Sequence, residues 1–166
     1  MFVCTGNGDV LASFGRKSKE GGGETLQEPL YVHVDHKERV LVSDRTQCCI
    51  KVYSLSGEFL GKFGSSGTSD GHLLSPHGLC EDAFGNILVC DTENKRVTAF
   101  DRQGHFIKHL LTATDGVTFP VDVTFDSESG HLAVSMHHTN GTFRKIRVYK
   151  IPSRAEAQKK GVARPQ

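Results

Sequence analysis

The sequence lacks any apolar run of the roughly 18 residues that a membrane-spanning helix requires. Its first segment, MFVCTGNGDV, lacks the basic and long apolar stretches of a signal peptide. Its five cysteines form no CxxC pair, and their odd number and the adjacent Cys48 and Cys49 argue against a disulfide framework. We therefore expect reduced thiols packed as small hydrophobic side chains, no membrane association and a cytoplasmic location.

Motifs of catalysis and metal binding are also missing. The sequence contains no GxSxG, HExxH or Walker motif. The histidines have no ligand spacing, and the adjacent His137 and His138 would point to opposite faces of a strand. The sequence therefore predicts no catalytic residue, no metal site and no cofactor.

Charge is unevenly distributed, although the formal net charge is only +1. Residues 1–143 contain 12 Lys or Arg and 18 Asp or Glu, whereas residues 144–166 contain 8 and 1. The first part is therefore acidic and the end of the chain is basic. We expect residues 152–166 to form a disordered basic tail.

The sequence does contain an internal repeat. Several positions recur 47 residues apart: Pro29 and Pro76, Asp44 and Asp91, Tyr53 and Phe100, Gly57 and Gly104. A third copy begins at Pro120 and has Ser135 where the other copies have Asp. A period of about 20–50 residues predicts a solenoid, a propeller or an array.

Each copy consists of short apolar runs separated by turn residues. In the second copy the runs are Gly78–Glu81, Ile87–Cys90, Arg96–Phe100 and Phe106–Leu111. The Gly, Asn and Asp clusters between them favour tight turns. No copy has a sustained helical period, so we expect helix only in the tail. Four short antiparallel strands per copy are typical of one blade of a β-propeller.

The second copy also resembles a known family. The run PHGL of residues 76–79, followed by GNILVCDTENKRV of residues 85–97, closely resembles the NHL repeat. The resemblance implies an all-β fold, a partial β-propeller of about three blades plus two strands of a preceding blade. We expect the propeller at residues 1–151, with blades at about 1–15 (partial), 26–64, 73–111 and 117–151. NHL propellers usually have more blades, so we expect missing blades in a longer parent chain, or self-association through the open blade faces.

The resemblance further implies a function. NHL propellers often occur in tripartite-motif ubiquitin ligases, so we expect a non-catalytic protein-recognition module that recruits the substrate of such a ligase. The first alternative is a propeller that binds single-stranded RNA in post-transcriptional repression. The second is a propeller lyase or lactonase with a metal ion in the central channel, for which the sequence offers no cluster of ligands.

In a propeller, the linkers between blades and the loops between second and third strands lie at the same end. We expect the binding residues at this end. These residues are Tyr31, Arg45, Gln47, His77, Lys95, Arg96, His137, His138, Arg144 and Lys145. Asp44 and Asp91 recur at the end of a strand, where an Asp side chain accepts backbone hydrogen bonds in a turn. We interpret these two residues as structural, not catalytic.

Overall fold

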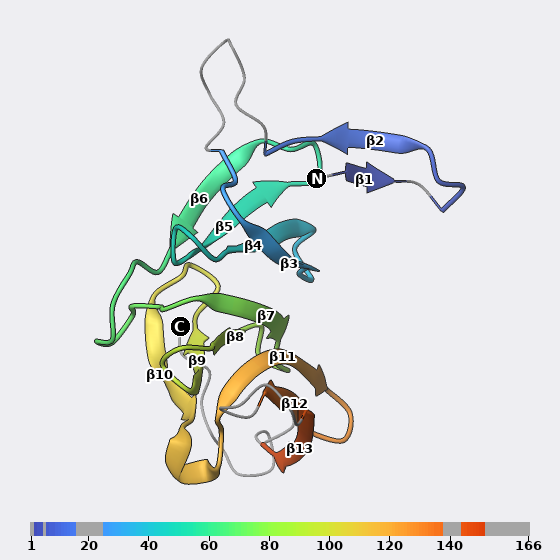
Figure 1. Ribbon diagram of the computed structural model, residues 1–166. Helices are drawn as coiled ribbons and strands as arrows, with labels where there is room; N and C mark the ends of the chain where they lie inside the picture. Colours follow the sequence, from blue (N-terminus) through green and yellow to red (C-terminus); the bar gives the residue numbers. More distant parts are fainter. Residues whose placement is uncertain (1, 5, 16–24, 138–143, 152–166) are drawn as a thin grey trace.

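The computed structural model describes residues 2–4, 6–15, 25–137 and 144–151, and within them the fold is built from antiparallel sheets (Figure 1). The N-terminal pair consists of β1 (Phe2–Cys4) and β2 (Val10–Ser13). The first blade consists of β3 (Pro29–Val34), β4 (Arg39–Asp44), β5 (Cys49–Ser54) and β6 (Phe59–Phe63). The second blade consists of β7 (Pro76–Glu81), β8 (Ile87–Asp91), β9 (Arg96–Phe100) and β10 (Phe106–Leu111). The third blade consists of β11 (Phe119–Asp126), β12 (His131–His137) and β13 (Arg144–Lys150).

Within each blade the strands follow one another in chain order, each hydrogen-bonded to the next. The second strands, β4 and β8, are nearly all buried, as their almost unbroken apolar sequences require. Gly57 and Gly104 both have a φ of 89° in the turn before the last strand, a conformation that favours glycine. The predicted all-β, partial propeller fold is confirmed.

The blades lie side by side, and their innermost strands β3, β7 and β11 are neighbours in space (Figure 1). Leu41, Ile50 and Phe100 belong to the core between the first and second blades. Leu88 and Leu132 belong to the core between the second and third blades. The second blade is therefore covered on both faces, which a single blade cannot achieve alone.

The cysteines follow the expectation only in part. All five are free thiols, and all except Cys4 are buried. Burial raises the pKa of Cys80 to about 12, so its thiolate is not formed at neutral pH. Cys4 is exposed at the end of β1, contrary to the expectation that every thiol belongs to the core.

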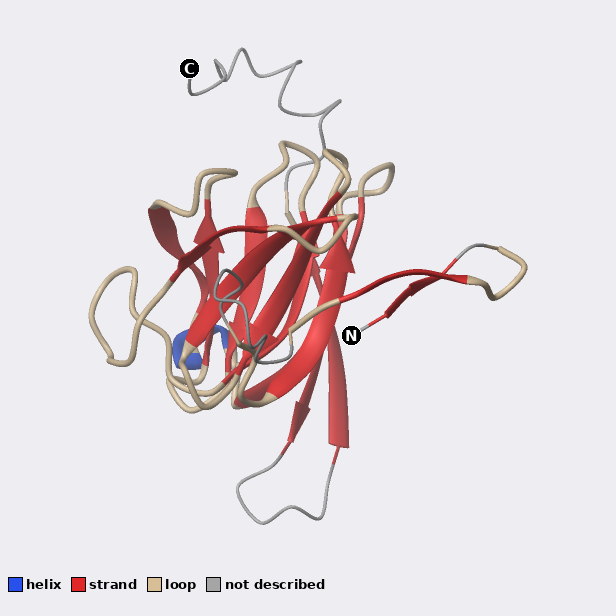
Figure 2. Ribbon diagram, turned by 90° about the horizontal axis from the view of Figure 1, so that it is seen from above, coloured by secondary structure: helices blue, strands red, loops and turns tan. Residues whose placement is uncertain are grey.

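One short helical segment was not expected. A 3₁₀ helix covers Ala113–Asp115 between the second and third blades (Figure 2, blue). Thr112 and Asp115 form a capping box, and Gly116 closes the turn in the left-handed conformation. The expectation of helix only in the tail was therefore wrong, because capping residues alone can close one turn. The helix predicted for the tail lies outside the described residues.

Apolar side chains are exposed on the two outer faces of the set of blades. Val32 and Val34 of β3 are 58% and 54% exposed, and Ile146 and Val148 of β13 are 71% and 64% exposed. Each belongs to a sheet face that no other described strand covers completely. No helix among the described residues is long and apolar enough to cross a membrane.

Candidate recognition surface at the linker end

One end of the molecule gathers the linkers that precede each blade and the loops between second and third strands. We call it the linker end. Backbone hydrogen bonds join Arg45 to Glu28 (3.0 Å) and Glu93 to Leu74 (3.2 Å). In the third blade, the Thr118 hydroxyl donates to the carbonyl of His137 at 2.9 Å. The sequence-based expectation that these segments share one end is therefore met by direct contacts.

Asp91 ties the linker end of the second blade together. Its carboxylate accepts from the N–H of Leu74 at 2.7 Å, from the Asn94 amide at 2.9 Å and from Nε of Arg96 at 2.7 Å. Burial raises the pKa of Asp91 despite these donors. The expected bonds to the following turn are thus only part of its role, because Asp91 also holds the linker that precedes the blade.

Arg96 is buried and serves the same linker. Besides Asp91, its guanidinium donates to the carbonyls of Thr68 (2.9 Å), Ser69 (3.3 Å) and His72 (3.1 Å). The guanidinium thus holds the backbone of this linker at three points. Arg96, a predicted binding residue, therefore lies under the surface rather than on it.

Asp44 has the matching role in the first blade with a different cation. Its carboxylate accepts from the N–H groups of Gln27 (2.8 Å) and Glu28 (3.2 Å) and pairs with Nζ of the fully buried Lys51 at 3.1 Å. Burial acts to raise the pKa of Asp44, but these donors outweigh it and hold the pKa below its usual value.

On the surface itself, Tyr31 and His77 form an aromatic pair with ring centroids 6.1 Å apart. Nδ1 of His77 lies 2.9 Å from the carbonyl of Ser75 and 2.9 Å from the hydroxyl of Thr92. A carbonyl can only accept, so Nδ1 carries a proton in this arrangement. The Thr92 hydroxyl donates onward to the carbonyl of Pro120 at 2.7 Å, which links the second blade to the third.

A hollow of about 410 Å³ lies beside this pair. It is lined by Tyr31, Val121, Asp122, His137, Lys145 and Ile146, among others. Burial and the nearby Asp122 carboxylate raise the pKa of Tyr31, so its hydroxyl stays a neutral donor. Elsewhere at the linker end, Nζ of Lys95 lies 4.9 Å above the ring of Phe119, a cation–π contact. The hollow therefore combines one acid, one base, two rings and aliphatic surface.

The remaining predicted residues do not line this hollow. Arg45 pairs with Glu28 at 2.8 Å and donates to the Ser75 hydroxyl at 3.2 Å, while the Gln47 amide donates to the carbonyl of Thr25 at 3.4 Å. Both therefore brace the linkers. Arg144 is the first residue of β13, and His138 lies outside the described residues.

Sequence reasoning missed Thr92 and Asp122. Thr92 follows the repeated Asp91 directly, so its place at the linker end could have been derived from the repeat. No sequence signal marked Asp122, whose importance depends on the approach of β11 to Tyr31.

Among the described residues, no group of three His, Cys, Asp or Glu side chains could hold a metal ion. The His77 ring is instead engaged with the carbonyl of Ser75 and the hydroxyl of Thr92.

Known proteins resemble this chain in both repeat sequence and fold. A family model described as the NHL repeat matches residues 73–100. The chain carries an NHL repeat. Its best-matching copy is the second blade, as the sequence pattern predicted, and it includes both Asp91 and Arg96.

Several curated relatives match the repeat region, among them two nematode proteins with a similar share of this chain covered. Protein lin-41 of Caenorhabditis elegans is 47% identical over 45 residues, which are 27% of this chain and 4% of that protein. The RING finger protein nhl-1 of the same animal is 42% identical over 48 residues, which are 29% of this chain and 5% of that protein. The matched stretches thus span a small fraction of these relatives.

Solved structures resemble the chain in fold alone. Virginiamycin B lyase of Staphylococcus aureus superposes with a TM-score of 0.54 at 13% identity, over 92% of this chain and 48% of that protein. Similarity at this identity concerns the arrangement of the strands and carries no functional residue across.

Proposed function

We propose that this NHL chain is a non-catalytic module that recognises a protein partner at its linker end. The observation that carries the proposal is the hollow beside Tyr31, which offers rings, an aliphatic wall, Asp122 and Lys145 within one concave site. Protein interfaces are centred on such sites, where aromatic anchors combine with a few polar groups.

The charges of the linker end favour a protein ligand over an RNA ligand. Single-stranded RNA binding relies on basic side chains that track phosphates and on exposed rings that stack on bases. Two of the predicted arginines are engaged, because Arg96 is buried against Asp91 and Arg45 pairs with Glu28. Asp122 adds a negative charge to the hollow itself. Lys95 and Lys145 are exposed cations of the surface, and they form a small basic footprint.

The cellular setting that we propose is a tripartite-motif type ubiquitin ligase in the cytoplasm, in which the propeller recruits the substrate. The support is the repeat-level identity to nhl-1, whose name includes a RING finger, and to the B-box type zinc finger protein ncl-1 of C. elegans, which is 40% identical over 45 residues. In such a ligase, Tyr31→Ala should reduce ubiquitination of the bound substrate and leave self-ubiquitination unchanged.

The binding test selects ligands from two libraries with the chain that lacks residues 152–166. Removing this basic tail avoids its non-specific affinity. A displayed peptide library and a random single-stranded RNA library are selected in parallel. We expect enriched peptides whose affinity falls at least tenfold in Tyr31→Ala and is unchanged in Lys108→Glu, a control on the exposed outer strand β10.

Salt dependence separates the two ligands. For a protein ligand, the slope of log affinity against log salt should be shallow. A selected RNA that binds tightly, with a slope of about −0.7 per contacted phosphate, would replace the protein proposal with the RNA alternative.

A further inference from the structure

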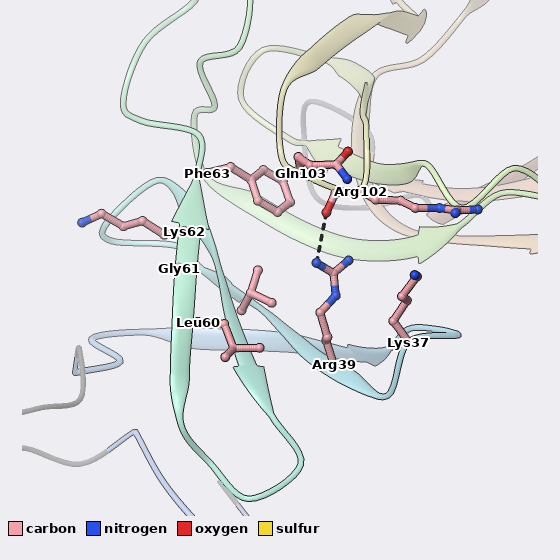
Figure 3. A pocket seen from close by; sticks show the side chains of 9 residues that line it. Lys37, Arg39, Leu60, Gly61, Lys62, Phe63, Arg102 and Gln103 are labelled. Carbon is pink, nitrogen blue, oxygen red and sulfur yellow. Dashed lines mark hydrogen bonds between the residues drawn. The ribbon is translucent and has the colours of Figure 1, made fainter. Parts of the chain in front are cut away.

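A second hollow, of about 390 Å³, lies between the first and second blades, near the β3–β4 and β9–β10 turns (Figure 3). It runs between β6, the edge strand of the first blade, and the turn that joins β9 to β10 in the second blade. We call it the outer groove, and its principal residues are Lys37, Arg39, Leu60, Gly61, Phe63 and Arg102. None of these residues belongs to the recognition surface.

The outer groove is positively charged. None of the residues that line it is acidic, whereas Lys37, Arg39, Lys62 and Arg102 are basic. Lys62 points away from the groove in Figure 3. Among the described residues, no acidic side chain forms an ion pair with Lys37 or Arg102. An excess of positive charge therefore remains at the rim.

Two basic side chains of the groove are fixed in place. The guanidinium of Arg102 donates to the carbonyl of Phe84 and extends away from β6, whereas that of Arg39 stays in the groove (Figure 3). Arg39 pairs with Asp35 at 2.6 Å, and its Nη1 donates to the carbonyl of Arg102 at 3.0 Å (Figure 3). This second contact ties the first blade to the β9–β10 turn and sets the width of the groove. The Arg39 guanidinium is thus positioned before any ligand arrives, which lowers the entropic cost of binding.

The wall along β6 is apolar and has open backbone. Leu60 is 51% exposed, and Phe63 is half-buried beside it. Gly61 has a φ of 154°, and a Cβ placed there would meet no atom within 4 Å. A glycine inside a strand often marks a place where another backbone approaches closely.

The equivalent strand of the second blade differs at this point. Leu60 corresponds to Ile107 along the 47-residue repeat, but Gly61 corresponds to Lys108. The long side chain of Lys108 occupies the position that is bare on β6. Open backbone next to an apolar side chain is therefore a property of the first blade, and the repeat does not require it.

We propose that the outer groove binds an extended acidic segment of a partner protein. The segment lies over β6 with its backbone at Gly61, its apolar side chains on Leu60 and Phe63, and its carboxylates beside Lys37 and Arg39. The groove spans β6, β5 and β4, so a segment that lies across these strands reaches Gly61, Val52 and Arg39 together. The positive charge of the groove predicts an acidic ligand. The site is separate from the recognition surface at the linker end.

The test uses a fluorescein-labelled peptide of alternating Glu and Leu, six residues long, and measures fluorescence anisotropy with the full chain. A peptide with Lys in place of every Glu is the charge control. We expect saturable binding of the acidic peptide, at least tenfold weaker binding of the basic one, and a loss of affinity as salt is raised.

Matched variants locate the site. Leu60→Glu and Lys37→Glu should each lower the affinity for the acidic peptide at least tenfold. Ile107→Glu, the same change at the position of β10 equivalent to Leu60, should leave this affinity unchanged. All three positions are exposed, so the far-ultraviolet circular dichroism of the variants should match that of the unaltered chain. Absence of saturable binding, equal binding of both peptides, or an equal loss in Ile107→Glu would each overturn the proposal.

Discussion

At the scale of the residue, the repeated Asp pairs with a different cation in the first and second blades. Asp91 uses Arg96, and Asp44 uses Lys51, which stands at the repeat position of Thr98 rather than that of Arg96. The third copy has Ser135 at this position and needs no buried cation. What recurs is therefore a carboxylate that holds the preceding linker, while the position of its cation is free to vary.

Asp91→Ala should lower the free energy of unfolding by about 3 kcal/mol, because it leaves the buried Arg96 without its carboxylate and the Leu74 N–H without an acceptor. Chemical denaturation measures the effect. The control is Glu93→Ala, an exposed change in the same turn, which should stay within about 0.5 kcal/mol of the unaltered chain. Equal effects of the two changes would contradict the anchoring role of Asp91.

The Asp35 carboxylate should contribute a stability that disappears in acid. It accepts from the N–H groups of Lys37 (3.0 Å) and Arg39 (2.9 Å) and pairs with the Arg39 guanidinium. Burial acts to raise its pKa, but these partners outweigh it and hold the pKa below its usual value. The unfolded chain then takes up a proton more readily than the folded one, so the contribution is present above about pH 5 and is lost as pH falls through the folded pKa.

Asp35→Asn should therefore flatten the decrease in unfolding free energy between about pH 5 and pH 3. Denaturant titrations at a series of pH values measure this slope. Glu38→Gln, an exposed change in the same turn, should keep the slope of the unaltered chain. A slope that is the same in Asp35→Asn as in the unaltered chain would show that Asp35 does not titrate in this way.

At the scale of the element, the inner strands β7 and β11 approach so closely that only glycine fits between them. A Cβ at Gly78 would lie 2.6 Å from Cα of Asp122 and 2.9 Å from the carbonyl oxygen of Val121. These are backbone atoms, which cannot move aside without shifting the strand. Gly78 thus fixes the distance between the second and third blades.

Gly78→Ala should lower the free energy of unfolding by roughly 1–3 kcal/mol through overpacking. It should also disturb the hollow beside Tyr31, since Val121 and Asp122 line it. The comparison is Gly6→Ala, where a Cβ meets nothing within 4 Å, and which should be close to neutral. If the unfolding temperature falls by the same amount in both variants, the close approach of β7 and β11 is not the reason that Gly78 is required.

At the scale of the whole molecule, stability is shared through the second blade, because its two faces belong to different cores. Leu132→Ala removes a fully buried side chain between the second and third blades and should cost about 2–5 kcal/mol. Repeat proteins couple neighbouring units through their interfaces. Hydrogen exchange should therefore accelerate in β4 and β5 of the first blade as well as in β11–β13. Acceleration confined to the third blade would show that the blades unfold independently.

The sequence by itself determined the strands, their order and the division into repeats. Alternating short apolar runs and turn residues are local signals, and a period of 47 residues states which blade each run belongs to. The same signals placed Tyr31, His77, Lys95, His137 and Lys145 at the linker end, because their positions within the repeat decide the end of the strand at which they lie. Their role in binding stays a prediction.

Which of those side chains are available depends on contacts between segments that are distant in the sequence. Arg96 looks like a surface cation in the sequence, but the linker of residues 65–75 folds over it and uses its donors. The hollow beside Tyr31 also has no local signal, because its walls come from the first and third blades and meet only when β7 stands between them. Burial and concavity depend on contacts between distant segments, and a local pattern carries no record of them.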